Sequence, residues 1–160
     1  MNVKTATKSP DGSVQLTLTE TSYNSLKIND QPGAGMRFVV QTNSTSVAKY
    51  DLSGDWMGTS TTTNDEFDEY KNLIQSTSIM TDDFGEYSTI EKNTYNNDPD
   101  AWLLGFIIET TTTKENIGKE PAASRTVVYT RDLTTGATLS EVYSPDVPAV
   151  SSSNCYTYEF

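Results

Sequence analysis

Short runs in which every second residue is apolar constrain the fold of this chain more than any other feature. The clearest run covers residues 13–21, where apolar Val14, Leu16 and Leu18 alternate with polar residues. Because successive side chains of a strand point to opposite faces of a sheet, such alternation predicts a half-buried strand. Comparable runs recur at residues 26–28, 35–41, 47–52, 87–90, 101–113, 126–130, 138–143 and 154–160. We therefore expect about 7–9 strands, typical of an all-β fold.

The composition is typical of a sheet with at least one solvent-exposed face. Hydrophobic residues make up 34% of the 160 residues, and threonine and tyrosine, which favour strands, are abundant. No repeat or linker divides the sequence, so we expect residues 1–160 to form a single all-β domain. Numerous strands without alternating helices indicate an antiparallel β-sandwich or barrel.

One segment has the pattern of a helix. Thr63 and Glu66 have the spacing of a capping box, which satisfies free N–H groups at a helix N-terminus. Apolar residues then follow at helical spacing, namely Phe67, Tyr70, Leu73 and Ile74. The sequence thus predicts one amphipathic helix over about residues 63–80, packed on the sheet with its acidic face outward.

Residues 101–113 form the most apolar stretch of the chain. Trp102, Leu104, Phe106 and Ile108 lie on one expected face, and Leu103 and Ile107 on the other. A strand that is apolar on both faces is typical of a sheet covered on both sides. We expect this segment to be the central strand and to lie in the core.

The negative charge is concentrated in the middle of the chain. Of the formal net charge of −11, residues 51–100 contribute −10, residues 1–50 contribute +2 and residues 101–160 contribute −3. Such a field repels nucleic acids, and no basic stripe offsets it. We expect the acids of this segment to form an interaction surface that includes Asp65, Asp68, Glu69, Asp82, Asp83 and Glu86.

The residue types that most often carry catalysis are scarce. There is no histidine, Cys155 is the single cysteine, and no nucleotide-binding or nucleophile motif occurs. We predict no catalytic residues, no cofactor and no metal site, because residues 82–86 and 96–100 lack the ligand spacing of an EF-hand. Weak calcium binding and an acid-based, glycan-active enzyme stay open as alternatives, since twenty-two acids offer many carboxylate pairs.

Gly54-Asp55-Trp56 matches the G-x-W element with which lipocalins begin their barrel. The chain departs from that pattern in two respects. About fifty residues with strand character precede the element, and the segment after it is short for an eight-stranded barrel. We do not assign the chain to the lipocalins.

No apolar run approaches the roughly 18 residues that a membrane-spanning helix needs. The first ten residues also lack the apolar region of a signal peptide. We expect a soluble protein without a membrane partner, located in a virion or in the cytoplasm.

These features together favour a non-catalytic structural or interaction subunit of a larger assembly, of the virion or surface-filament type. Its partners would be other protein subunits, copies of itself included, because a positive first third and an acidic middle third are complementary. Two alternatives remain: a carrier of small apolar ligands with a calycin-like barrel, and a carbohydrate-binding β-sandwich.

Overall fold

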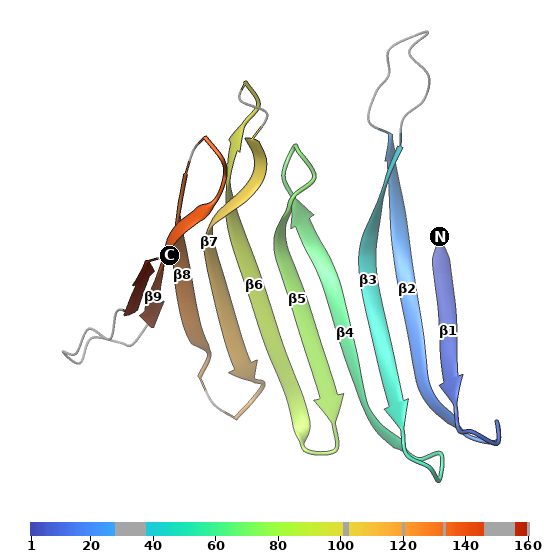
Figure 1. The fold of residues 1–160 in the computed structure, drawn as a ribbon. Coiled ribbons are helices and arrows are strands. Elements are labelled where there is room, and N and C mark those ends of the chain that lie inside the picture. The colour runs from blue at the N-terminus through green and yellow to red at the C-terminus, as the bar shows by residue number, and fades with distance from the viewer. Residues whose placement is uncertain (28–37, 101–102, 120, 133, 146–155, 160) are drawn as a thin grey trace, which may run out of the picture. The chain divides into compact units, whose positions relative to one another are not determined.

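A computed structural model describes residues 1–27, 38–100, 103–119, 121–132, 134–145 and 156–159. Ten strands lie in these segments (Figure 1). Their bounds are β1 Asn2–Lys8, β2 Gln15–Lys27, β3 Phe38–Tyr50, β4 Trp56–Phe67, β5 Leu73–Asp82, β6 Gly85–Asp98, β7 Leu103–Asn116, β8 Ala123–Arg131, β9 Thr138–Pro145 and β10 Tyr156–Glu159. The predicted all-β class is confirmed.

The strands follow one another in chain order, each hydrogen-bonded to the next, in a single antiparallel sheet. Contacts divide the chain into two compact units, and the division cuts across β4, β5 and β6. Unit 1 comprises residues 1–64 and 78–86, and unit 2 comprises residues 65–77 and 87–160.

Unit 1 contains β1, β2, β3 and most of β4. Its registers are regular over long stretches; for example, Thr5 pairs with Thr19, and Val47 pairs with Ser60. A bulge between Lys49 and Tyr50 shifts the register where β3 leaves its pairing with β4. Residues opposite one another in such a ladder share a face, so the register decides which side chains meet.

Unit 2 contains most of β6, together with β7, β8, β9 and β10. Asn93 of β6 pairs with Thr110 of β7, and Val127 of β8 pairs with Tyr143 of β9. Bulges interrupt the β6–β7 ladder after Thr94 and after Asn96. Near these bulges, the Asn97 side chain forms hydrogen bonds with Gly105 of β7 and with Asp68.

The predicted helix over residues 63–80 is wrong. These residues form the end of β4, a turn at 68–72 and most of β5. The Asp68 N–H donates to the Asn72 carbonyl oxygen, and the Lys71 N–H donates to the Asp68 carbonyl oxygen, at 2.9 and 3.0 Å. These bonds reverse the chain, and the β-branched residues on either side favour strands over a helix.

Within the described part of the chain, no helix has the length and apolarity that a membrane crossing requires.

Several strands differ from the predicted runs in extent. β2 joins the runs at 13–21 and 26–28, and β3 joins most of the runs at 35–41 and 47–52. β1 and β4 were not predicted, because their residues are mostly polar and give no apolar alternation. Parts of four predicted runs, at residues 28, 35–37, 101–102, 154–155 and 160, lie outside the described residues.

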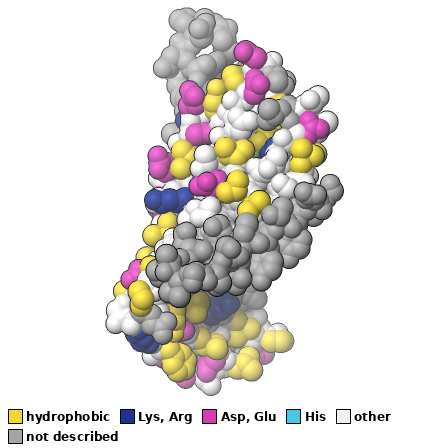
Figure 2. All heavy atoms as spheres, turned by 90° about the vertical axis from the view of Figure 1, so that its left-hand side faces the viewer, with side chains coloured by type: hydrophobic (Ala, Val, Ile, Leu, Met, Phe, Trp, Pro, Cys, Tyr) yellow, Lys and Arg dark blue, Asp and Glu magenta, His cyan; other side chains and the backbone are white. Residues whose placement is uncertain are grey.

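The described residues include no buried hydrophobic side chain. The segment expected to be the core is only half-buried, from Leu103 to Ile108. In Figure 2, hydrophobic side chains are scattered among polar and acidic ones on the face in view. Both faces of these strands carry many threonines and serines, so neither face gathers enough apolar surface to form a core.

Hydroxyl groups instead meet across neighbouring strands in both units. In unit 1 the Ser22 and Ser44 hydroxyls lie 2.7 Å apart, and those of Thr62 and Ser78 lie 2.8 Å apart. In unit 2 the Thr113 and Ser124 hydroxyls lie 2.7 Å apart. Each such pair satisfies polar groups that strand packing partly shields from water, and cross-strand pairs of this kind contribute roughly 0.2–1 kcal/mol each.

Candidate functional site

The six predicted surface acids lie at two turns, three in each unit. Asp82, Asp83 and Glu86 lie at the β5–β6 turn in unit 1, where β5 ends. The other three belong to unit 2 and lie before β5 begins, namely Asp65, Asp68 and Glu69.

The β5–β6 turn is held by the carboxylate of Asp82. Its Oδ1 accepts hydrogen bonds from the backbone N–H groups of Phe84 and Gly85, at 2.8 and 3.1 Å. An aspartate that accepts from N–H groups two and three residues further along mimics a backbone turn. The Phe84 side chain at the tip of this turn is 78% exposed, and Asp83 beside it is also exposed.

The β4–β5 turn is held by a denser polar network around Asp68. Asp68 Oδ1 accepts from the Asn72 N–H at 2.8 Å, and Oδ2 accepts from the side-chain amides of Asn72 and Asn97, both at 2.9 Å. Asn97 Oδ1 in turn accepts from the Gly105 N–H at 2.8 Å. Both oxygens of Asp68 are therefore committed to holding the turn and β6 together.

The network perturbs two titratable groups. Partial desolvation of Asp68 acts to raise its pKa, but the hydrogen bonds from Asn72 and Asn97 outweigh it and hold the pKa below its usual value. The pKa of Tyr95 is raised by burial and by the negative charges of Asp68 and Glu91. The Tyr95 hydroxyl donates to the Leu73 carbonyl oxygen at 2.9 Å, and this hydrogen bond links β6 to β5.

The remaining acids at this turn do not converge on Asp68. Asp65 Oδ2 accepts from the Thr77 hydroxyl, and Glu69 is exposed. Among the described residues, no three His, Cys, Asp or Glu side chains gather closely enough to hold a metal ion.

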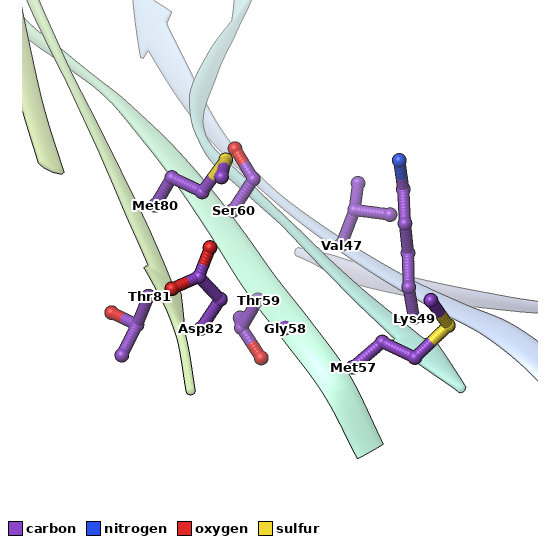
Figure 3. Close-up of a pocket in the computed structure, with 9 residues that line it drawn as sticks. All are labelled: Val47, Lys49, Met57, Gly58, Thr59, Ser60, Met80, Thr81 and Asp82. Atoms are coloured by element: carbon purple, nitrogen blue, oxygen red, sulfur yellow. The ribbon is translucent and has the colours of Figure 1, made fainter. Parts of the chain in front are cut away.

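An apolar hollow lies on one face of unit 1 (Figure 3). Its volume is about 180 Å³. The side chain of Met80 points toward Ser60, and that of Met57 points toward Lys49. The hollow is lined by Val47, Lys49, Met57, Gly58, Thr59, Ser60, Met80, Thr81 and Asp82, from β3, β4 and β5.

The register explains why the hollow forms at this point. Gly58 lies opposite β5 without a side chain, and a β-carbon there would stand 3.0 Å from the Thr81 carbonyl oxygen. The missing side chain leaves space that the long, flexible side chains of Met57 and Met80 border, at 58% and 48% exposure. Lys49 is exposed at the rim and forms no ion pair with a described residue.

Unit 2 has a group of interacting side chains on β8 and β9. The Arg125 guanidinium lies 4.5 Å from the centre of the Tyr143 ring, and that of Arg131 lies 5.4 Å from the centre of the Tyr129 ring. The Tyr143 hydroxyl donates to Glu141 at 2.8 Å, and this bond raises the pKa of Tyr143. The Arg125–Tyr143 contact joins β8 to β9 and stabilises their pairing, whereas Arg131 and Tyr129 both belong to β8.

Sequence reasoning missed the hollow. Val47, Met57 and Met80 lie on three strands, and only the register brings them together. One sequence signal could have indicated the neighbouring turn: residues 82–86 place a phenylalanine among three acids, where a buried aromatic is not expected.

Comparison with protein families, with curated proteins and with solved structures finds no match to this chain.

Proposed function

We propose that this chain is a non-catalytic structural or interaction subunit that assembles with other protein subunits, copies of itself included. A virion shell or a surface filament is the kind of assembly that would use it. The observation that carries the proposal is that no described hydrophobic side chain is buried. Burying apolar surface stabilises a protein by roughly 25 cal/mol per Å², so the half-exposed apolar side chains of this sheet favour contact with a further surface.

The sequence predicted a sandwich or barrel within one chain, and we modify this prediction here. We propose that a sheet from a second subunit covers the half-buried side chains, so that a sandwich forms between subunits. Sheets that pack face to face lie about 10 Å apart and interdigitate their side chains. Residues such as Leu104, Phe106 and Val47 are half-buried and suited to such a layer.

The two alternative functions have less support. The hollow of unit 1, at about 180 Å³, is smaller than the roughly 300 Å³ at which sites for small ligands begin. Its size favours a single side chain of a partner over a carried ligand. For sugar binding, the rings of Tyr129 and Tyr143 each have one face occupied by an arginine, which leaves less open aromatic surface for stacking.

Sedimentation equilibrium across a concentration series and a salt series tests the proposal. We expect oligomers that grow with protein concentration and dissociate partly as salt rises from about 0.05 to 0.5 M, because salt screens contacts between opposite charges. A monomer that persists at millimolar protein in low salt would contradict the proposal.

A further inference from the structure

Exposed apolar side chains gather at one end of unit 1. The turn at 51–55 and the β5–β6 turn flank the same end of β4, because Gly58 near the start of β4 lies against Thr81 near the end of β5. Large exposed hydrophobic side chains at this end are Leu52 at 75%, Trp56 at 39%, Met57 at 58%, Met80 at 48% and Phe84 at 78%. A concentration of this kind marks an interaction site more often than scattered apolar residues do.

We propose that the β5–β6 turn of one copy, residues 82–86, inserts Phe84 into the Met57–Met80 hollow of a second copy, and that the second copy does the same in return. This inference rests on the proposed self-assembly and names the contact that begins it. The partner is a second copy of this chain.

Size and chemistry of the hollow suit a phenylalanine. A benzyl side chain is of the order of the hollow's volume of about 180 Å³, whereas most small ligands are larger. Two of its walls are the methionines Met57 and Met80, whose sulfur atoms make favourable contacts with aromatic rings. Phe84, at 78% exposure, offers most of its ring for burial.

Charge favours this same occupant. The incoming turn carries Asp83, which is exposed, and Glu86, which is partly exposed, on either side of Phe84. Lys49 at the rim of the hollow forms no ion pair with a described residue and would meet these carboxylates. A neutral aromatic segment would lack this pairing with Lys49.

The placement of the two parts allows a symmetric contact. Asp82 lines the hollow and is also the residue that anchors the turn carrying Phe84. The inserting group and the receiving site are therefore adjacent on one patch of unit 1. Such a patch is self-complementary, as the interface of a two-fold symmetric dimer must be.

Photo-crosslinking locates the contact directly. A benzophenone amino acid replaces Phe84, and the variant is mixed with ¹⁵N-labelled wild-type protein, so that mass spectrometry separates crosslinks between copies from those within one. We expect intermolecular crosslinks to Met57 or Met80. Intermolecular crosslinks only to residues of unit 2, or none from a protein that does oligomerise, would overturn the inference.

Charge exchange provides a second test that does not depend on the ring. The variant Lys49→Glu and the variant Asp83→Lys with Glu86→Lys should each raise the dissociation constant about 5-fold or more, since like charges then meet. An equimolar mixture should restore wild-type affinity, because both contacts of the mixed dimer again pair opposite charges. A mixture as weak as its components would overturn the inference.

A matched pair of apolar substitutions separates this inference from the proposed function. Phe84→Ser should weaken association about 10-fold or more, as loss of a buried anchor does. Leu139→Ser, which alters a side chain of unit 2 that is 46% exposed, should change it less than about 2-fold. If wild type and both variants associate equally, the proposed Phe84 contact is wrong and the proposed self-assembly stands. If wild type is a monomer, the proposed contact and the proposed self-assembly are both wrong.

Discussion

The turns at residues 51–55 and 68–72 share one backbone design and achieve it by different means. In each, the N–H of the first residue, Asp51 or Asp68, donates to the carbonyl oxygen of the fifth at 2.9 Å. In each, the fourth residue has a left-handed backbone, with φ of 90° at Gly54 and 72° at Lys71. The Asp carboxylate caps N–H groups inside its own turn in both cases.

The difference lies in what offsets the cost of the left-handed residue. Gly54 adopts this backbone with little steric cost, whereas a lysine pays roughly 1–2 kcal/mol for it. The 68–72 turn compensates with side-chain bonds to Asp68 from Asn72 and Asn97. A tight turn without glycine therefore depends on its polar network, and the network ties it to β6.

We expect the largest change in the free energy of unfolding when the network around Asp68 is removed. Asp68→Ala removes three hydrogen bonds to a carboxylate and should lower the free energy of unfolding by about 2–3 kcal/mol. Asp51→Ala removes two bonds from backbone N–H groups only, at Ser53 and Asp55, and should cost about 1–2 kcal/mol. Urea unfolding followed by circular dichroism measures both, and equal losses would contradict the proposed role of the network.

A smaller effect is expected from adding a side chain to the first turn. Gly54→Ala forces a β-carbon into the left-handed region and should destabilise the protein by roughly 1 kcal/mol. The added carbon meets only Val14 Cγ1, at 3.9 Å, which is an ordinary contact, so the cost is one of backbone conformation. Gly54→Asn is the control, because asparagine tolerates this region better, and it should lose less.

The reverse substitution in the second turn should stabilise the protein. Lys71→Gly relieves the strain at φ 72°, and after the greater entropy of glycine in the unfolded chain we expect a net gain of about 0.5–1 kcal/mol. Lys71→Ala removes the same charge without relieving the strain, so it should give no gain. A gain shared by both variants would indicate a charge effect instead.

The two turns also show how far the sequence could predict this fold. Alternating apolar residues indicated β2, much of β3, β7, β8 and β9, because these strands keep one partly apolar face. Residues 68–72 contain no glycine, and Phe67, Tyr70 and Leu73 match helical spacing by coincidence. The sequence therefore did not indicate the hydrogen-bond network around Asp68, which holds a turn where a helix was predicted.

The candidate site was predictable in its charge and not in its geometry. The sequence shows that Asp83 and Glu86 belong to an acidic segment; in the structure Asp83 is exposed in the β5–β6 turn, and Glu86 is partly exposed at the start of β6. The sequence does not show that Val47, Met57 and Met80 come together, since a one-residue slip in any ladder would turn these side chains to the other face. Register is set by turns and bulges, and a turn such as 68–72, with its left-handed Lys71, gives little signal in the sequence.

The smallest expected effect is a difference in acid sensitivity that Asp68 produces. Its pKa in the folded protein is held below the value of about 3.9 in the unfolded chain, so the ionised carboxylate is the form that the turn stabilises. Its contribution to stability is fully present above the unfolded pKa and is lost as pH falls through the folded pKa.

Asp11, with a pKa of about 2, and Asp132 also have lowered pKa values and act in the same direction, so the effect of Asp68 must be measured as a difference between variants and wild type. Urea midpoints from pH 6 to pH 2 should fall less steeply for Asp68→Asn than for wild type, with Asn97→Ala, which removes one donor to Asp68, between them. Identical slopes for the three proteins would show that the hydrogen bonds of this turn do not favour the charged carboxylate.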